Sequence, residues 1–340
     1  MEMTAGKAKP PAPLAVSMGE PGGIGPDIIL EAVKGGPDGE TAPDFLVFGD
    51  PVTLSERAIQ LGLDVSIVGP SAGRPVGANL PVEPTSTSEG FVAGVLTKDS
   101  AKAALASLSA ATRAVAEGRC SGLVTAPINK SNLYEIGFEF PGHTEFLEHF
   151  TRTELAEPQA RSVMMLAGPR LRAVPVTIHV PLAQVPSLLR SQDIIDICRI
   201  TAADLQRRFG IENPRLAVAG LNPHAGENGS IGSEEKELIE PAIKRLRLDG
   251  IQIDGPFPAD TLFHEEARGR YDVAVCTYHD QALIPAKALD FHDTVNVTLG
   301  LPFVRTSPDH GTALELAGTG YASPRSFVAA LRMAATMVQG

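Results

Sequence analysis

The chain alternates short apolar runs with longer segments in which apolar residues recur every three or four positions. The short runs predict β-strands at Leu14–Met18, Asp44–Phe48, Ser121–Thr125, Leu171–Ile178, Arg215–Ala219, Tyr271–Thr277 and Thr294–Leu299. The longer segments predict helices at Asp27–Val33, Ser100–Glu117, Thr144–Phe150, Asp193–Phe209, Glu234–Leu248 and Ser326–Val338. This alternation indicates an α/β fold with a largely parallel sheet.

The predicted sheet is mixed and the chain divides into two lobes. Ser162–Leu166 and Leu171–Ile178 flank Gly168-Pro169, which predicts an antiparallel hairpin. A length of 340 residues suggests two domains. We expect a first lobe of residues 14–142 plus about 290–340 and a second lobe of about 143–289. Residues 1–13 are rich in Pro, Ala and Lys and predict a disordered leader.

Composition narrows the class of protein. Apolar residues make up 43% of the chain and charged residues 20%, a balance typical of soluble globular proteins. The formal net charge of −11, the absence of Trp and an aromatic content of 5% disfavour nucleic acid as a partner. No apolar run approaches the ~20 residues of a membrane helix, and the first residues lack the apolar core of a signal peptide.

The cysteines point to a reducing compartment. The chain has three cysteines, Cys120, Cys198 and Cys276, and no C-x-x-C pair. An odd number of widely spaced cysteines argues against a disulfide framework and against a cysteine zinc site. Cys276 lies inside a strand pattern, so we expect it in the core rather than as a nucleophile. We therefore expect a cytoplasmic globular protein of the enzyme class.

Three histidines follow predicted strands. His179 ends the fourth predicted strand, His224 follows the fifth and His279 follows the sixth. Open α/β sheets assemble their active sites at the carboxyl ends of strands. One such histidine is more often a hydrogen-bonded edge residue, but three at equivalent positions favour a catalytic metal site with one open coordination position. Their wide spacing excludes a compact H-E-x-x-H helix, so tertiary or quaternary structure must assemble the site.

A cationic and polar group follows the third histidine. Lys287, Asn296 and Arg305 lie between it and residue 310. Lys and Arg beside a metal site in an acidic protein suggest an anionic substrate, because Arg makes forked contacts with carboxylate or phosphate. Without the histidines, two surface cations would be the simpler interpretation. His143 and Thr144 precede a predicted helix, with Thr144 as its expected N-cap.

Two further loops have open interpretations. Gly19–Asp27 joins a strand to a helix, as anion-binding turns do, but its spacing is neither G-x-G-x-x-G nor a P-loop, and a tight turn explains it equally well. Asn129-Lys130 is favoured as functional only because it follows a strand.

Taken together, these segments resemble the 4-hydroxythreonine-4-phosphate dehydrogenase family of vitamin B6 biosynthesis. The matching stretches run from about residue 14 to 335 and include GEPGGIGPD (19–27), TAPINK (125–130), PGHTEF (141–146), IHVPL (178–182), GLNPHAGENGSIG (220–232), GPFPADTLF (255–263), YHDQ (278–281) and VNVTLGLPFVRTSPDHGTALELAG (295–318).

The resemblance implies a two-domain α/β/α fold like that of isocitrate and isopropylmalate dehydrogenases, and a homodimer with the active site at its interface. It implies one divalent metal, Zn, Mg or Co, held by three histidines from both subunits, which match His179, His224 and His279. It also implies NAD or NADP as the hydride acceptor, without a Rossmann fingerprint. The substrate contacts of the family match His143, Thr144, Lys287, Asn296 and Arg305.

The implied reaction is oxidation of 4-phosphohydroxy-L-threonine to 2-amino-3-oxo-4-phosphohydroxybutanoate, which decarboxylates to 3-amino-2-oxopropyl phosphate in pyridoxal 5'-phosphate biosynthesis. The metal would lower the pKa of the substrate hydroxyl, and hydride would pass to the nicotinamide. Lys287, Asn296 and Arg305 would hold the phosphate or carboxylate end. Lys287, Asp260 and Asp280 are the candidate catalytic residues, the two aspartates for roles beside the metal or in proton transfer.

Three alternatives stay open. Relatives of this family act on threonate or erythronate 4-phosphate, or on cis-dihydrodiols. A three-histidine metal hydrolase would need the metal and the cations but no nicotinamide. A metal or phosphometabolite sensor would bind ligand without turnover, but it predicts an effector domain for which the matched span leaves almost no chain.

Overall fold

The computed structural model describes residues 12–34, 41–72, 78–86, 88 and 90–340. The described strands form one twelve-stranded sheet in the order β3-β4-β2-β1-β5-β12-β11-β6-β7-β10-β8-β9. Their bounds are β1 (Leu14–Ser17), β2 (Phe45–Gly49), β3 (Ser66–Val68), β4 (Asn79–Pro84), β5 (Leu123–Thr125), β6 (Val163–Ala167), β7 (Arg172–Thr177), β8 (Arg215–Ala219), β9 (Gln252–Phe257), β10 (Val273–Tyr278), β11 (Val295–Leu299) and β12 (Arg305–Pro308).

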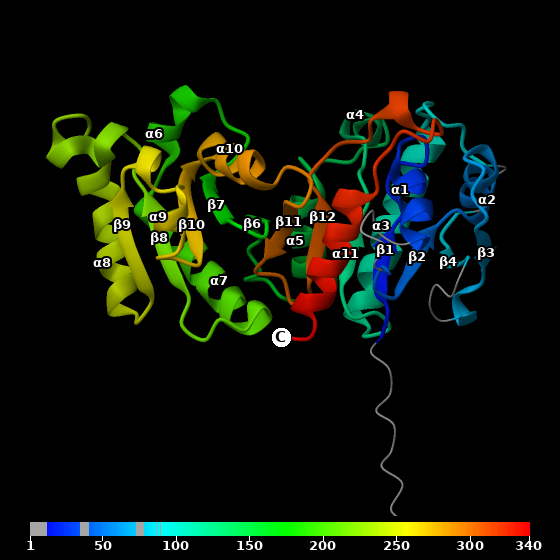
Figure 1. The fold of residues 1–340 in the computed structure, drawn as a ribbon, viewed down its shortest axis with the longest axis horizontal. Coiled ribbons are helices and arrows are strands. Elements are labelled where there is room, and N and C mark those ends of the chain that lie inside the picture. The colour runs from blue at the N-terminus through cyan, green and yellow to red at the C-terminus, as the bar shows by residue number, and fades with distance from the viewer. Residues whose placement is uncertain (1–11, 35–40, 73–77, 87, 89) are drawn as a thin grey trace, which may run out of the picture.

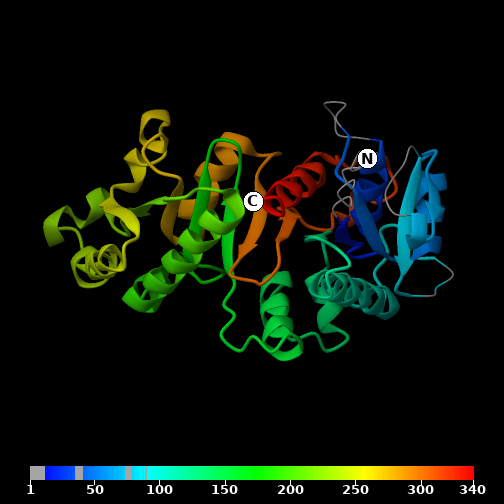
Figure 2. The same ribbon diagram turned by 90° about the horizontal axis from the view of Figure 1, so that it is seen from below.

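Helices cover both faces of the sheet. The α-helices are α1 (Gly25–Val33), α2 (Pro51–Gln60), α3 (Lys98–Ala116), α4 (Lys130–Tyr134), α5 (His143–Glu154), α6 (Val185–Leu188), α7 (Ser191–Phe209), α8 (Glu240–Leu248), α9 (Glu265–Arg268), α10 (His279–Asp290) and α11 (Arg325–Met337). Short helical turns are η1 (Pro70–Ala72), η2 (Leu182–Gln184), η3 (Pro223–Gly229), η4 (Glu235–Ile239), η5 (Ala259–Thr261) and η6 (Leu314–Leu316). Figure 1 shows β6, β11 and β12 in the middle of the elongated molecule, and Figure 2 shows α11 on one side of the sheet with α3 and α5 on the other.

The sheet is largely parallel with an antiparallel centre. β11 runs antiparallel to both β12 and β6, and β6 runs antiparallel to β7, whereas the other paired strands are parallel. The expected α/β class, the mixed sheet and the hairpin on either side of Gly168 are therefore confirmed. The antiparallel pairs lie where the two halves of the sheet join.

Alternating side chains divide the sheet between two cores. In β1, Val16 packs in the core that contains α1 and α11, while Ala15 packs in the core that contains α3. Likewise Val295, Val297 and Leu299 of β11 face the first core. Because successive residues of a strand point to opposite faces, Asn296 and Thr298 must point to the other face. The polar residues of β11 thus lie on the side that carries the candidate site.

All seven predicted strands and six predicted helices exist, with ends shifted by a few residues. The predicted helix at Glu234–Leu248 begins as a π-helical turn, η4, and becomes regular only in α8. Pro241 stands at the start of α8, and its missing N–H interrupts the regular hydrogen-bond series there. Cys276 is fully buried, as expected.

Other elements were not predicted from the sequence. They are α2, α4, α6, α9 and α10 and strands β3, β4, β9 and β12. α10 contains Pro285 in its interior, and β9 contains Gly255 and Pro256; these residues interrupt the patterns that identify a helix or a strand. The predicted N-cap was also wrong, because α5 begins at His143 with Gly142 as its N-cap, which places Thr144 inside the helix.

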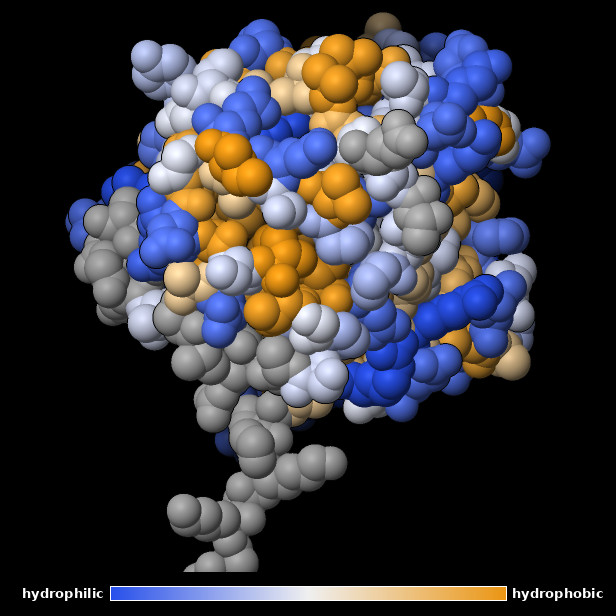
Figure 3. Space-filling view, turned by 90° about the vertical axis from the view of Figure 1, so that its right-hand side faces the viewer, coloured by the Kyte–Doolittle hydropathy of each residue, from blue (hydrophilic) through white to orange (hydrophobic). Residues whose placement is uncertain are grey.

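The outer surface offers fewer clues to function. Figure 3 shows apolar side chains gathered on the end of the molecule that carries β3, where α2 exposes Val52 and Ile59. None of the helices in the described part of the chain is both long and apolar enough to cross a membrane.

Two predictions about the organisation of the chain are not tested. Of the expected leader at residues 1–13, all but Ala12 and Pro13 lie outside the described residues. The two-lobe division stays a prediction.

Candidate active site

A cavity of about 410 Å³ lies over the centre of the sheet. The carboxyl end of β5 and the central strands β11 and β12 form its floor, the start of α5 and the middle of α10 form its walls, and the loop after β7 closes one end. Of the residues expected in the site, it brings together seven: His143, Thr144, His179, His279, Lys287, Asn296 and Arg305. Residues far apart in the sequence therefore converge on one hollow.

Arg305 is the charged residue at the floor of this cavity. Its side chain is 2% exposed, and its two terminal nitrogens donate to the hydroxyls of Thr298, at 2.9 Å, and Thr125, at 2.7 Å. Its Nε is buried without a hydrogen-bond partner. Burial lowers the pKa of Arg305 to about 10, so it stays charged at neutral pH. The interpretation of this residue as a surface cation is wrong, since β12 places it inside the sheet.

Two neighbours of Arg305 also carry unsatisfied atoms. Nε2 of His143 and Oδ1 of Asn296 are buried without a hydrogen-bond partner in the structure. Burial, and then the charges of Arg305 and Lys130, hold the pKa of His143 well below its usual value, so the ring is neutral near pH 7. Leaving a buried polar atom unpaired costs about 1–3 kcal/mol. Three such atoms around one cavity indicate a site built for a polar ligand.

Lys287 provides a second cation. It lies on α10, and its Nζ is 2.6 Å from Oδ2 of Asp309, which follows β12. Both side chains line the cavity and are partly buried. An anionic ligand that binds Lys287 must therefore share the ammonium group with Asp309 or displace the Asp309 carboxylate.

Two of the three expected metal ligands lie together. The rings of His179 and His279 have centroids 5.8 Å apart, and they follow β7 and β10, which are paired in parallel. Asp280 Oδ1 lies 2.7 Å from Nδ1 of His279, which leaves Nε2 free to bind a metal. Burial is the main cause that lowers the pKa of His179, which favours the neutral form that binds metals.

His224 does not join this pair within one chain. It lies in η3 after β8, and among the described residues no three His, Cys, Asp or Glu side chains form a group that could hold a metal ion. His224 has φ of 53° and His179 has φ of 52°, the left-handed region that non-glycine residues rarely adopt. Such backbone strain is concentrated at functional sites. Asp260 lies in η5, next to η3, and is exposed away from the central cavity.

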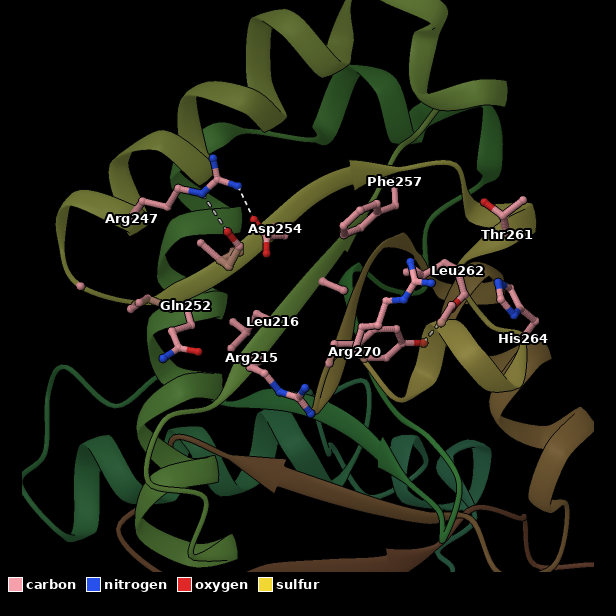
Figure 4. Close-up of a pocket in the computed structure, with 16 residues that line it drawn as sticks. Arg215, Leu216, Arg247, Gln252, Asp254, Phe257, Thr261, Leu262, His264 and Arg270 are labelled. Atoms are coloured by element: carbon pink, nitrogen blue, oxygen red, sulfur yellow. Dashed lines mark hydrogen bonds and ion pairs between the residues drawn. The ribbon is translucent and has the colours of Figure 1, made fainter.

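A larger cavity, of about 770 Å³, lies at the β8–β9 edge. Figure 4 shows its three arginines, Arg215, Arg247 and Arg270, around a space that Leu216, Phe257 and Leu262 also line. Arg215 is paired with Asp272 and Arg247 with Asp254, and none of its side chains is among the buried atoms without a partner. The smaller central cavity therefore has the stronger chemical case as the active site.

The glycine-rich loop is a tight turn rather than an open anion cradle. Residues 14–30 are all buried. A Cβ at Gly19, Gly22 or Gly25 would collide with the backbone of Pro127, Val95 or Met18, respectively. The buried Arg57 donates to the carbonyls of Pro21 and Gly23 and pairs with Asp27. Of the two open interpretations, the structure favours close packing.

Sequence reasoning missed several cavity residues. Glu145, Asp309 and His310 line the central cavity but were not singled out, and Lys130 was noted only for its position after a strand. Each lies inside one of the motifs that carried the family resemblance, which is the signal that identifies them. Their charge and proximity emerge only in the folded chain.

A mixed α/β sheet with a buried, polar, cationic cavity at its centre defines an enzyme that acts on a small anionic molecule. Residues 41–334 match the family model described as pyridoxal phosphate biosynthetic protein PdxA, and the chain belongs to this family. The expected resemblance is confirmed.

Curated relatives match over nearly the whole chain. A 4-hydroxythreonine-4-phosphate dehydrogenase from Xanthobacter autotrophicus is 51% identical over 95% of this chain and 93% of its own. One from Bradyrhizobium diazoefficiens is 50% identical over 96% of each. A crystal structure of 4-hydroxythreonine-4-phosphate dehydrogenase from Klebsiella pneumoniae covers 96% of this chain and 100% of its own, with 36% identity and a TM-score of 0.86.

Proposed function

We propose that this protein oxidises 4-phosphohydroxy-L-threonine with NAD or NADP, giving 2-amino-3-oxo-4-phosphohydroxybutanoate, which decarboxylates to 3-amino-2-oxopropyl phosphate for pyridoxal 5'-phosphate synthesis. The family and the names of relatives at about 50% identity support this activity. The observation that carries it is the buried Arg305, whose unpartnered Nε fits an anionic group, beside the unpartnered Oδ1 of Asn296, which fits a hydroxyl or ammonium donor of the same small substrate.

Of the expected divalent metals Zn, Mg and Co, the histidine pair fits Zn and Co, because imidazole suits these ions whereas Mg prefers oxygen ligands. His179 and His279 would hold the metal, and His224 from a second copy of the chain would complete the set in a homodimer. When bound, the metal lowers the pKa of the substrate hydroxyl and polarises the carbonyl that replaces it. Asp280 orients His279 through its Nδ1.

The residues of the cavity supply binding and proton transfer. The Nε of Arg305 and the amide nitrogen of Asn296 would donate to the phosphate, and Thr144 lines the same cavity at the start of α5. Lys287 is the candidate proton carrier, since its ammonium group reaches the cavity from α10. Asp260 would act near the metal only if a second copy brings η5 to the site.

The test is reduction of NAD and of NADP, followed by absorbance of the reduced nicotinamide. Purified protein with each of Zn, Mg and Co is given 4-phosphohydroxy-L-threonine, threonate 4-phosphate, erythronate 4-phosphate or a cis-dihydrodiol. We expect the highest kcat/KM with the first substrate. Absence of nicotinamide reduction with every substrate would overturn the proposal.

A specific comparison keeps one alternative in this panel. A terephthalate 1,2-cis-dihydrodiol dehydrogenase from Burkholderia xenovorans is 29% identical over 96% of this chain, with a TM-score of 0.64. Its name denotes a diol with anionic groups, so the buried Arg305 is compatible with that chemistry as well. The lower similarity makes oxidation of a cis-dihydrodiol the second candidate function.

We also propose a cytoplasmic location, in accord with the fully buried, unpaired cysteines.

A further inference from the structure

Lys130 is a charged residue of the central cavity to which the proposed reaction assigns no role. It is the first residue of α4, its side chain lines the cavity, and its charge lowers the pKa of both His143 and His179. In the described part of the chain no carboxylate lies within ion-pair distance of it. Lys287, by contrast, is paired with Asp309.

The backbone that carries Lys130 is firmly held. The side chain of Asn129 accepts hydrogen bonds from the backbone N–H of Asn132, at 3.0 Å, and from the hydroxyl of Ser131, at 2.7 Å. The buried amide of Asn132 then donates to Glu20, at 3.0 Å, and to the carbonyl of Thr97, also at 3.0 Å. These bonds fix a helix of only five residues at the edge of the cavity.

Lys130 and Arg305 occupy different parts of the cavity. Arg305 is 2% exposed and lies on the floor between Thr125 and Thr298. Lys130 is exposed at the edge of the cavity, where it begins α4. The Nζ of Lys130 lies beside the start of α5, because a Cβ at Gly142 would be 3.7 Å from it and 3.4 Å from Oε2 of Glu145.

We propose that Lys130 binds the carboxylate of the substrate while Arg305 binds its phosphate, so that the cavity selects molecules with an anionic group at each end. This inference rests on the proposed function for the identity of those groups. At the floor, the Nε of Arg305, the amide nitrogen of Asn296 and the hydroxyl of Thr144 can donate, which suits the three terminal oxygens of a phosphate. Lys130 offers one compact charge at the edge of the cavity, which suits the smaller carboxylate.

The test compares Lys130→Met and Lys130→Arg with wild type on two substrates. One is 4-phosphohydroxy-L-threonine and the other is its analogue with a carboxamide in place of the carboxylate. We expect Lys130→Met to raise the KM for the first substrate about 10- to 100-fold and to leave the KM for the carboxamide within about twofold of wild type, since the interacting partner is already absent. Lys130→Arg should retain most of the affinity for the carboxylate.

Calorimetric titration with inorganic phosphate gives a second readout. We expect Lys130→Met to bind phosphate as wild type does, and Arg305→Met to lose that binding. Lys102→Met is the matched control, because this exposed lysine of α3 pairs with Asp99 outside the cavity and its loss changes the net charge equally. Equal melting temperatures would show that the variants fold.

Two results would overturn the inference: an equal rise in KM for the carboxylate and the carboxamide, or a parallel loss of phosphate binding in Lys130→Met. If wild-type protein reduces neither nicotinamide, the proposed function fails. In that case the role of Lys130 is tested by binding alone. The Kd values of the carboxylate substrate and its carboxamide analogue are measured by calorimetry for wild type and for Lys130→Met.

Discussion

Arg305 combines features that folding alone does not favour. A cation that is 2% exposed is costly when its hydrogen bonds within the described residues go to two threonine hydroxyls, because desolvation of a charge is repaid chiefly by an opposite charge. The charge of Glu145 offsets that cost only in part, since burial still dominates the pKa of Arg305. Burial depresses the pKa of Arg305 to about 10 for the same reason. The residue is therefore best explained by the ligand it binds.

Replacing the buried Arg305 should affect the stability and the activity of the protein in opposite directions. Arg305→Met keeps much of the volume and removes the buried charge, so we expect an unchanged or higher melting temperature together with loss of activity. Arg305→Lys keeps the charge but cannot donate to Thr125 and Thr298 in the same forked arrangement, so kcat/KM should fall about 100-fold. Calorimetry and initial rates check both. A large fall in the melting temperature of Arg305→Met would show that Arg305 is needed mainly for folding.

The pKa of His143 predicts a pH effect on stability. In the folded chain this pKa lies well below 6.5 because the ring is buried, and in the unfolded chain it returns to about 6.5. Above pH 6.5 both states leave the ring neutral. Below it the unfolded chain binds a proton that the folded chain does not, so the free energy of unfolding falls by about 1.4 kcal/mol per pH unit from this group, down to its folded pKa.

His143→Asn should remove that contribution. We expect urea unfolding curves between pH 7 and 5 to show a shallower loss of stability for this variant than for wild type. His149→Asn is the control, since His149 is exposed on the same helix. Parallel pH profiles for wild type and His143→Asn would contradict the assignment.

At the scale of elements, the glycine-rich loop predicts a steric effect. Gly22 has the carbonyl oxygen of Val95 where a Cβ would stand, and backbone cannot move aside as a flexible side chain can. Gly22→Ala should therefore lower the free energy of unfolding by about 1–3 kcal/mol, measured by chemical denaturation. Gly69→Ala is the matched control, because nothing lies within 4 Å of its Cβ position. Equal stability of the two variants would rule out the close packing.

Local sequence patterns explain which helices and strands could be predicted and which could not. Hydrophobic periodicity located the strands that bear the histidines, because buried parallel strands read as continuous apolar runs. It missed α10, in which Pro285 interrupts the helical pattern, and β12, whose four residues are polar or proline although all are buried. Since Arg305 begins β12, its burial depends on pairing with β5 and β11, which no local pattern contains.

At the scale of the whole molecule, the positions of the histidines after β7, β8 and β10 were predictable, but their distances were not. Parallel pairing places β10 between β7 and β8, yet the left-handed turn in η3 directs the chain so that His224 stays apart from the other two. The ion pair between Lys287 and Asp309 likewise joins segments on either side of β11 and β12. These relations depend on tertiary structure and, in the proposed homodimer, on a second copy that would supply His224.

A shared metal site predicts complementation between inactive variants. His179→Ala and His224→Ala homodimers would each lack one ligand at both sites, so each should be inactive. When the two homodimers are mixed, dissociated and allowed to reassociate, half of the new dimers would contain one chain of each kind. In such a dimer one site receives both altered residues and the other receives neither. Because each mixed dimer has one intact site of two, we expect about a quarter of wild-type activity to return.

The pair His179→Ala and His279→Ala is the control for this experiment. These two residues lie together in one chain, with ring centroids 5.8 Å apart, so every site of a mixed dimer lacks one of them. No activity should return, and bound metal, measured by atomic absorption, should stay low. Absence of recovery in both mixtures, with chain exchange verified, would place His224 with its own chain's histidines, and the homodimer would then have no part in forming the metal site.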